Sequence, residues 1–191
     1  MTVAVFLDRD GILDEPVADP VDGRPESPLR AADVRLVDGA AEGCRRLTDA
    51  GFLLVVVSNQ PGAAKGKATM DDLWAVHARV AALLDDEGVE IDDWRYCFHH
   101  PDAVDDELRG PCDCRKPAPG MLLAAAAAHG IDLPASWMIG DRDTDVEAGA
   151  RAGCRTVLVE HPGSAHRRSG DAGADVVSHS LRGAARLIAA P

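Results

Sequence analysis

Long hydrophobic runs are missing from this sequence of 191 residues, and no stretch is apolar enough to cross a bilayer. The amino-terminal part also lacks the basic start, apolar stretch and small-residue cleavage site of a signal peptide. These absences exclude an integral membrane protein and predict a location in the cytoplasm. We expect the chain to act there as a monomer.

Positive charge is also in short supply, with 20 Lys and Arg residues against 32 Asp and Glu residues and a net charge of −12. A field of this sign repels the phosphate backbone of DNA and RNA, and no stripe of cations opposes it. Nucleic acid is therefore excluded as a partner. A small anionic substrate would need a local cluster of cations, a helix amino terminus or a bound metal ion.

Cysteine is sparse and odd in number, with five residues in a chain that lacks a secretory signal. This count predicts free thiols or metal ligands rather than a disulfide framework. The remaining composition is ordinary for a globular protein, since 46% of the residues are hydrophobic and 27% are charged. The length predicts one domain that spans residues 1–191.

Strand-like apolar runs alternate with helical patterns along the chain. Strands are predicted at 3–7, 53–57, 94–98, 137–139 and 156–159. Helices are predicted at 39–50, 70–86, 118–129, 145–152 and 181–190. Because this alternation requires crossover connections, we expect an α/β fold with a Rossmann-like, doubly wound, mainly parallel sheet sandwiched by helices. Ligands of such sheets bind beyond the carboxyl ends of the strands.

Three segments are too long and too irregular to be simple connections, namely 14–33, 60–68 and 99–116. Long loops on a compact domain are usually functional or disordered. None of them carries the pattern of a large helical insertion. We therefore expect no separate cap domain and an open site.

Two carboxylates, Asp8 and Asp10, directly follow the first predicted strand and precede Gly11. Carboxylates so placed suit a hard cation, although an isolated Asp-x-Asp-Gly is more often an acidic turn. Further polar residues follow two other predicted strands, and two cations precede a predicted helix. They are Ser58, Asn59 and Gln60, then Asp141 and Asp145, and the cations Arg115 and Lys116.

Four short patterns therefore occur in a fixed order at the ends of successive elements. They are Asp8-x-Asp10-Gly11, Ser58, Lys116 and Gly140-Asp141-x-x-x-Asp145. In this order they resemble the four signature motifs of the haloacid dehalogenase superfamily, and the resemblance covers nearly the whole chain. It implies a phosphoryl-transfer enzyme, because members with the second aspartate are typically phosphatases.

The resemblance implies a catalytic role for four residues. Asp8 would be the nucleophile, forming an aspartyl phosphate that splits one difficult displacement into two easier ones. Asp10 would donate a proton to the leaving group and later activate water. Ser58 and Lys116 would bind the oxygens of the transferred phosphoryl group, over which the transition-state charge spreads.

The same resemblance implies a Mg²⁺ cofactor. Its ligands would be Asp8, Asp141 and the backbone carbonyl of Asp10, and the ion would neutralise charge between two anions that react. The place of Asp145 in the motif fits either an indirect ligand or a residue that orients Lys116.

Two tight pairs, Cys97-x-His99 and Cys112-x-Cys114, bracket one of the long segments. Three thiols and an imidazole are enough for a closed, structural Zn²⁺ site. The alternative is a set of buried free cysteines with a surface histidine. We favour zinc because the pairs bracket an otherwise structureless loop, residues 97–114. The ion would hold this loop rigid, so that the two cations after it point at the substrate.

His100 is a rival zinc ligand, directly beside His99. The run Cys-x-His-His-Pro, followed by Cys-x-Cys-Arg-Lys-Pro, is similar to the zinc-bearing branch of the superfamily and favours His99. That branch contains phosphatases of D-glycero-D-manno-heptose 1,7-bisphosphate and of histidinol phosphate. Cys44 and Cys154 lie in or beside predicted core elements, and we interpret them as packing residues.

The residues predicted to contact the substrate are Asn59, Gln60, Lys65, Arg115 and Arg142. Lys65 and Arg142 could equally be solvated surface charges. Lys65 stands where this branch has arginine, which removes bidentate recognition of a phosphate. The long zinc loop and the run at 59–66 favour a sugar bisphosphate, heptose 1,7-bisphosphate, as the substrate. Histidinol phosphate is the alternative, and a catalytically silent domain that binds phosphorylated ligands is a distant third.

Overall fold

A computed structural model describes residues 2–19, 22–170 and 172–189. Within them one parallel sheet has the strand order β5-β4-β1-β6-β7-β8. Its strands are β1 (Ala4–Leu7), β4 (Leu53–Asn59), β5 (Asp93–Cys97), β6 (Trp137–Gly140), β7 (Arg155–Val159) and β8 (Val176–Ser178). The predicted α/β fold with a mainly parallel sheet is confirmed.

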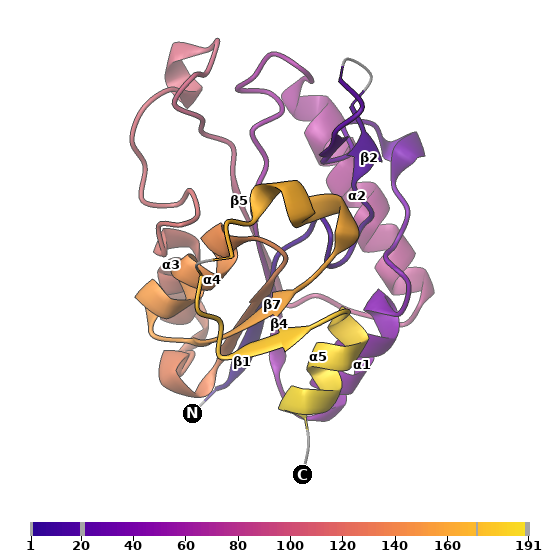
Figure 1. Cartoon of the computed structure of the whole chain (residues 1–191), viewed down its shortest axis with the longest axis vertical. Helices are drawn as coiled ribbons and strands as arrows, with labels where there is room; N and C mark the ends of the chain where they lie inside the picture. Colours follow the sequence, from indigo (N-terminus) through magenta and orange to yellow (C-terminus); the bar gives the residue numbers. More distant parts are fainter. Residues whose placement is uncertain (1, 20–21, 171, 190–191) are drawn as a thin grey trace.

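Helices cover both faces of this sheet (Figure 1). They are α1 (Ala40–Asp49), α2 (Met70–Asp86), α3 (Gly120–His129), α4 (Asp143–Ala152) and α5 (Leu181–Ile188). Local chemistry fixes their ends. Thr69 begins α2 by accepting a hydrogen bond from the backbone of Asp72, and Gly153 ends α4 with a φ of 87°.

The central strand β1 is buried on both sides. Val5 and Leu7 pack in a core cluster with side chains of α1, α2 and α5, whereas Ala4 and Phe6 pack in a second cluster with side chains of α3 and α4. Successive side chains of a strand point to opposite faces, so a strand covered on both sides is apolar at every position. Each large apolar side chain buried in this way contributes about 1.5–3 kcal/mol.

The strand order fixes where the functional residues meet. The chain leaves β1 toward β4 and β5 on one side, and returns to the other side of β1 with β6, β7 and β8. The carboxyl ends of β1, β4 and β6 are therefore neighbours. Crevices at such a switch point are where open α/β sheets bind ligands. The residues that follow these three strands meet in one place.

Most predicted elements are found at or near their predicted bounds. α2 occupies the predicted range 70–86, and the helix predicted at 181–190 ends at Ile188, with residue 190 outside the described residues. The sequence does not predict β8 or a small antiparallel hairpin, β2 (Val17–Ala18) with β3 (Pro25–Glu26). Strands of two or three residues are too short to show an alternating pattern.

The space above the carboxyl ends of the sheet holds loops. Between β1 and α1 the described residues form the hairpin and a short 3₁₀ helix, η1 (Ala31–Asp33), and the segment 99–116 carries only η2 (Asp106–Leu108). The described part of the chain thus contains no helical cap domain, as predicted. None of its helices is long and apolar enough to span a bilayer.

Candidate active site

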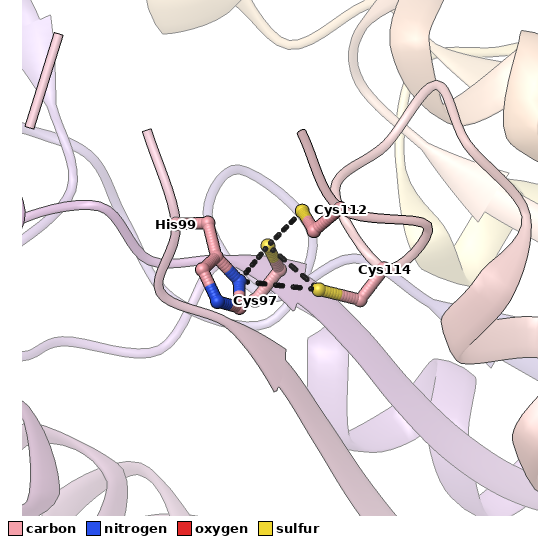
Figure 2. Close-up of side chains that lie close together, drawn as sticks. All are labelled: Cys97, His99, Cys112 and Cys114. Carbon is pink, nitrogen blue, oxygen red and sulfur yellow. Dashed lines mark hydrogen bonds between the residues drawn. The ribbon is translucent and has the colours of Figure 1, made fainter. Parts of the chain in front are cut away.

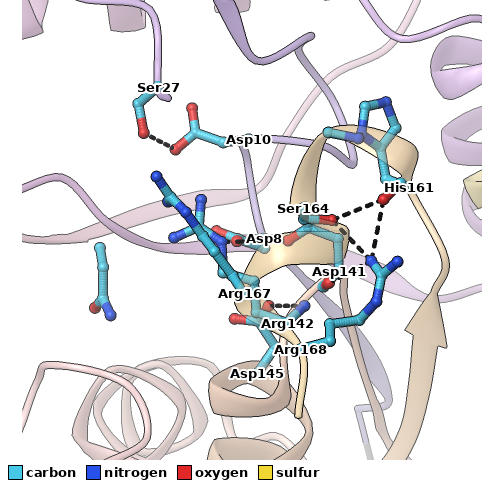
Figure 3. A network of polar contacts seen from close by, with 12 residues as sticks. Asp8, Asp10, Ser27, Asp141, Arg142, Asp145, His161, Ser164, Arg167 and Arg168 are labelled. Carbon is cyan, nitrogen blue, oxygen red and sulfur yellow. Dashed lines mark hydrogen bonds and ion pairs between the residues drawn. The ribbon is translucent and has the colours of Figure 1, made fainter. Parts of the chain in front are cut away.

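Asp8, Asp141 and Asp145 form a buried carboxylate cluster at the carboxyl ends of β1 and β6 (Figure 3). One carboxylate oxygen of each lies within 4.8 Å of the others. Asp8 is 4% exposed, and Asp141 and Asp145 are fully buried. Like charges so close and so far from water repel one another strongly, and need a compensating cation.

Asp141 carries the clearest sign that this cluster suits a cation. Both of its carboxylate oxygens are buried without a hydrogen-bond partner. Burial, together with the charges of Asp8 and Asp145, raises the pKa of Asp141 to about 7. A Cβ atom at Gly11 would lie 2.2 Å from Oδ2 of Asp141, so only glycine leaves room for this carboxylate. The donor set is all oxygen, which suits Mg²⁺.

Lys116 supplies one positive charge to the cluster. Its Nζ lies 2.9 Å from Oδ1 of Asp8 and 2.6 Å from Oδ1 of Asp145. Burial alone would lower the pKa of Lys116, but the two carboxylates outweigh burial and raise it. The ammonium group therefore stays charged. This geometry favours Asp145 as the residue that orients Lys116, one of the two roles that the sequence leaves open.

The side chain of Asp10 belongs to a different set of contacts. Arg9 donates to Oδ1 through Nη2 at 2.6 Å and Nε at 3.2 Å, while Ser27 Oγ and Gln60 Nε2 each donate to Oδ2 at 2.7 Å. Burial would raise the pKa of Asp10, but Arg9, Arg142 and the hydrogen bonds of Ser27 and Arg9 lower it to about 2. Four hydrogen bonds therefore hold this carboxylate in one orientation.

Ser58, Asn59 and Gln60 lie together at the end of β4, as predicted, but face different partners. Ser58 is buried and accepts a hydrogen bond of 3.1 Å from Gln60 Nε2. Asn59 bonds to the backbone of Lys116 in both directions. Gln60 is 2% exposed, and its amide reaches Asp10. This favours a positioning role for Asn59 and Gln60 over direct substrate contact.

A cavity of about 230 Å³ opens beside Lys116. Its walls include four predicted substrate residues, Asn59, Lys65, Arg115 and Arg142, and also Arg167 and Glu26, which the sequence does not single out. Figure 3 shows Arg167 in the same cluster of side chains as Arg142 and Asp8. The cavity thus provides the local positive charge that an anionic substrate needs in this acidic protein.

The site residues that the sequence pattern does not identify lie mainly in loops and short elements. Ser27 and Glu26 belong to the segment between β1 and α1, and Arg167 belongs to a 3₁₀ helix, η4 (Pro162–Arg167). Arg9 lies between the two motif aspartates and is 1% exposed. Its guanidinium pairs with Asp10 and Asp14. A signal for this burial is in the sequence, since an arginine at the end of an apolar strand is rarely buried without a carboxylate partner.

The second cluster contains Cys97, His99, Cys112 and Cys114, whose ligand atoms all lie within 4.8 Å of one another (Figure 2). Cys97 Sγ is 3.7 Å from Cys112 Sγ, 3.1 Å from Cys114 Sγ and 3.6 Å from His99 Nδ1. In a tetrahedral site with zinc–sulfur bonds of about 2.3 Å, neighbouring ligand atoms are about 3.5–3.8 Å apart. Two of the three separations match this spacing, and the third, between Cys97 Sγ and Cys114 Sγ, is shorter. The cluster therefore has the ligand types of a closed zinc site and a spacing close to that of one.

His100 points elsewhere, since its Nδ1 accepts a hydrogen bond of 3.1 Å from the backbone of Asp102. The cluster also connects to the active site, because Arg115 Nη1 donates to the carbonyl oxygen of His99 at 3.0 Å. Cys44 and Cys154 are buried in the two core clusters. Arg115, one of the cations that line the cavity, thus follows directly after the loop of residues 97–114.

Comparison with known proteins agrees with this geometry. A family model described as HAD-hydrolase-like matches residues 113–184. The chain is similar to the D-glycero-beta-D-manno-heptose-1,7-bisphosphate 7-phosphatase of Yersinia pestis, with 36% identity over 98% of this chain and 95% of the relative. The enzyme with the same name from Escherichia coli K12 is 37% identical over 93% of this chain and 89% of the relative.

Solved structures show the same fold. A D,D-heptose 1,7-bisphosphate phosphatase from B. bronchiseptica, in complex with magnesium and phosphate, aligns with a TM-score of 0.76 and 27% identity over 98% of each chain. The corresponding protein of Burkholderia thailandensis aligns over the full length of both chains with a TM-score of 0.70 and 24% identity. With relatives this similar over nearly its whole length, the chain belongs to the haloacid dehalogenase superfamily and is a phosphatase.

Proposed function

We propose that this phosphatase removes the 7-phosphate of D-glycero-D-manno-heptose 1,7-bisphosphate by transferring it to Asp8. The observation that carries the proposal is the pairing of a buried aspartate and lysine, Asp8 and Lys116, with a cation-lined cavity beside them. One phosphate can react at Asp8 while the second is bound by the remaining cations. The names of the relatives from Y. pestis and E. coli support the choice of sugar.

The first chemical step forms one bond and breaks one. A carboxylate oxygen of Asp8 attacks phosphorus, and the bond from phosphorus to the sugar oxygen breaks. A sugar alkoxide is a poor leaving group, so Asp10 donates a proton to it. The approach of a phosphate dianion raises the pKa of Asp10 from its low value in the free enzyme, which favours the protonated form for this step.

The second step releases phosphate. Asp10, now a carboxylate, takes a proton from water, and the water oxygen attacks the phosphorus of the aspartyl phosphate. The contacts from Arg9, Ser27 and Gln60 keep Asp10 oriented through both steps. Lys116 and Ser58 would bind the oxygens of the phosphoryl group, where negative charge is spread in the transition state.

Magnesium fits the carboxylate cluster, and Asp8, Asp141 and the backbone carbonyl of Asp10 would hold it. The bound ion would neutralise negative charge between the nucleophile and the phosphate. The buried position of Asp141, with its carboxylate close to those of Asp8 and Asp145, supports this assignment. Zinc fits the second cluster, where Cys97, His99 and the Cys112–Cys114 pair leave no position for water, so its role would be structural.

Histidinol phosphate is the second candidate substrate, and the cavity disfavours it. The amine of histidinol phosphate carries a positive charge, and the cavity is itself lined by cations, among them Lys65, Arg115, Arg142 and Arg167. Among the described lining residues only Glu26 is acidic. Repulsion between the amine and these cations would lower the affinity for histidinol phosphate. A second phosphate would instead be attracted.

The test is phosphate release with Mg²⁺ from heptose 1,7-bisphosphate, histidinol phosphate and simple sugar monophosphates. We expect the bisphosphate to have the highest kcat/KM, and Asp8→Asn to abolish turnover of every substrate. Wild-type turnover that survives Asp8→Asn would sink the aspartyl-phosphate mechanism. A higher kcat/KM for histidinol phosphate would sink the choice of substrate and leave the mechanism standing.

A further inference from the structure

An ion pair joins two loops above the active site. Arg167 Nη2 lies 2.8 Å from a carboxylate oxygen of Glu26, and the same nitrogen donates to the carbonyl oxygen of Pro25 at 3.1 Å. Glu26 belongs to strand β3 of the hairpin and Arg167 ends η4, so the pair connects segments about 140 residues apart in the sequence. Both side chains line the cavity beside Lys116.

The cationic side chains that line the cavity differ in how far nearby carboxylates neutralise their charge. Lys116 is paired with Asp8 and Asp145, and Arg142 lies 3.7 Å from Asp141. Arg115 donates to a backbone carbonyl, which carries no net charge. Among the described residues that line this cavity, Glu26 is the one carboxylate. Its wall away from the reacting carboxylates is therefore positively charged.

Lys65 reports the same excess of charge. Its side chain is half-buried, and its pKa is lowered by burial and then by repulsion from Lys67, Arg167 and Arg115, against the attraction of Glu26. Cations that depress the pKa of a neighbour in this way are stabilised by any anion that enters between them. Glu26 partly fills this role in the structure.

We propose that Arg167 is a substrate-binding residue for the second, non-reacting phosphate, and that Glu26 is the internal anion that this phosphate displaces. The inference rests on the proposed function in one respect, that the substrate carries two phosphates. The planar guanidinium of Arg167 can form paired hydrogen bonds with a phosphate or with a carboxylate. A phosphate dianion carries more charge and more acceptor oxygens than the Glu26 carboxylate.

A phosphate can displace Glu26 from Arg167 at a small cost in free energy. Its side chain is 31% exposed and that of Arg167 is 22% exposed, so the ion pair is partly screened by water. The hairpin has a second attachment, because Lys67 Nζ lies 2.6 Å from Oδ2 of Asp19, the residue that follows β2. Loss of the Glu26 contact therefore leaves the hairpin anchored, and Arg167 is freed for the substrate.

The experiment compares kcat/KM for heptose 1,7-bisphosphate with kcat/KM for heptose 7-phosphate, which reacts at the same position but lacks the second phosphate. We expect Arg167→Gln to lower the ratio of the two about ten- to hundredfold, through KM for the bisphosphate alone. Arg167→Lys should recover part of the ratio, because it keeps the charge without the fork. Arg182→Gln breaks an ion pair with Glu42 far from the cavity and is the matched control.

Glu26→Gln tests the second half of the proposal. Removal of the competing carboxylate should lower KM for the bisphosphate several-fold, and the gain should vanish in the Arg167→Gln, Glu26→Gln double variant. An equal loss with both substrates in Arg167→Gln, or an unchanged KM in Glu26→Gln, would overturn the inference. If heptose bisphosphate is not a substrate, the same ratio measured with fructose 1,6-bisphosphate and its 6-phosphate still tests Arg167, so the two failures are distinguishable.

Discussion

Asn59 and Lys116 hold each other through two reciprocal hydrogen bonds. Asn59 Nδ2 donates to the carbonyl oxygen of Lys116 at 3.0 Å, and the backbone N–H of Lys116 donates to Asn59 Oδ1 at 3.0 Å. The first residue ends strand β4, and the second follows Cys114 by two positions. One amide side chain thus connects the rigid sheet to the loop that carries Lys116.

This pair predicts that Asn59 affects catalysis by positioning Lys116. Asn59→Ala removes both hydrogen bonds, so Lys116 is no longer held in register with Asp8, and we expect kcat to fall about tenfold. Zinc content should stay the same, because no zinc ligand is touched. Steady-state kinetics and metal analysis check both points, and an unchanged kcat would show that the zinc loop alone positions Lys116.

Lys116 should also matter for stability. Lys116→Met leaves the carboxylates of Asp8 and Asp145 buried without their shared cation, which costs about 3–5 kcal/mol in the free energy of unfolding. Urea unfolding without Mg²⁺ measures this loss. The double variant with Asp145→Asn should regain part of the stability and none of the activity. A single variant as stable as the wild type would mean that the carboxylates are already protonated.

The residues of the carboxylate cluster could be predicted from the sequence because short-range rules place them. A strand fixes the position of the residue that follows it, and parallel strands bring their carboxyl ends together. Asp8 and Asp141 directly follow apolar strands, and Ser58 is the last but one residue of a third, so their convergence is a consequence of topology. The clustering of Cys97, His99, Cys112 and Cys114 could be predicted for a related reason, since closely paired cysteines and histidine have few uses other than metal binding.

Glu26, Ser27 and Arg167 could not be predicted in the same way. They lie in the hairpin segment and in η4, where no periodic pattern fixes the direction of a side chain. Their contacts with Asp10 and with one another depend on how loops far apart in the sequence fold over the sheet. Charged and hydroxyl side chains in such loops are common on any surface, so residue type alone carries no signal.

Loss of zinc should lower activity without unfolding the sheet. Cys112→Ser removes one thiolate from the cluster, and we expect zinc binding to fall and kcat to drop about tenfold or more, because Arg115 and Lys116 follow directly along the chain. Far-UV circular dichroism should change little. Cys154→Ala, which removes a thiol outside the cluster, should keep both zinc and activity. Full activity in a zinc-free Cys112→Ser protein would contradict a positioning role for the loop.

The ion pairs of Asp93 predict a dependence of stability on pH. Burial raises the pKa of Asp93, but hydrogen bonds from Arg95 and His129 outweigh it, so the pKa of the folded protein lies below its usual value. The stabilisation is therefore present above the unfolded pKa and is lost as the pH falls through the folded pKa. Between about pH 7 and about pH 3, the wild-type melting temperature should fall more than that of Asp93→Asn. Parallel curves for the two proteins would rule out this contribution.

Ser27 should act through Asp10. Its hydroxyl donates to Oδ2 of Asp10 at 2.7 Å, and a hydrogen bond to the charged form of a carboxylate lowers its pKa. In Ser27→Ala we therefore expect kcat to fall about three- to tenfold, and the alkaline limb of the pH profile of kcat/KM, on which Asp10 loses the proton that it donates, to move to higher pH. Ser27→Thr, which keeps the hydroxyl, should restore both quantities.

The matched control for this prediction is Ser180→Ala. Ser180 Oγ accepts a hydrogen bond of 3.0 Å from the backbone of Gly183 and caps α5, away from the active site. Its loss should cost about 1 kcal/mol of stability and leave the pH profile of activity in place. The two serines thus separate a general loss of stability from a specific effect on the proton-transfer residue. A pH profile of Ser27→Ala that superimposes on that of Ser180→Ala would show that Ser27 contributes only to the fold, and that Arg9 and Gln60 suffice to orient Asp10.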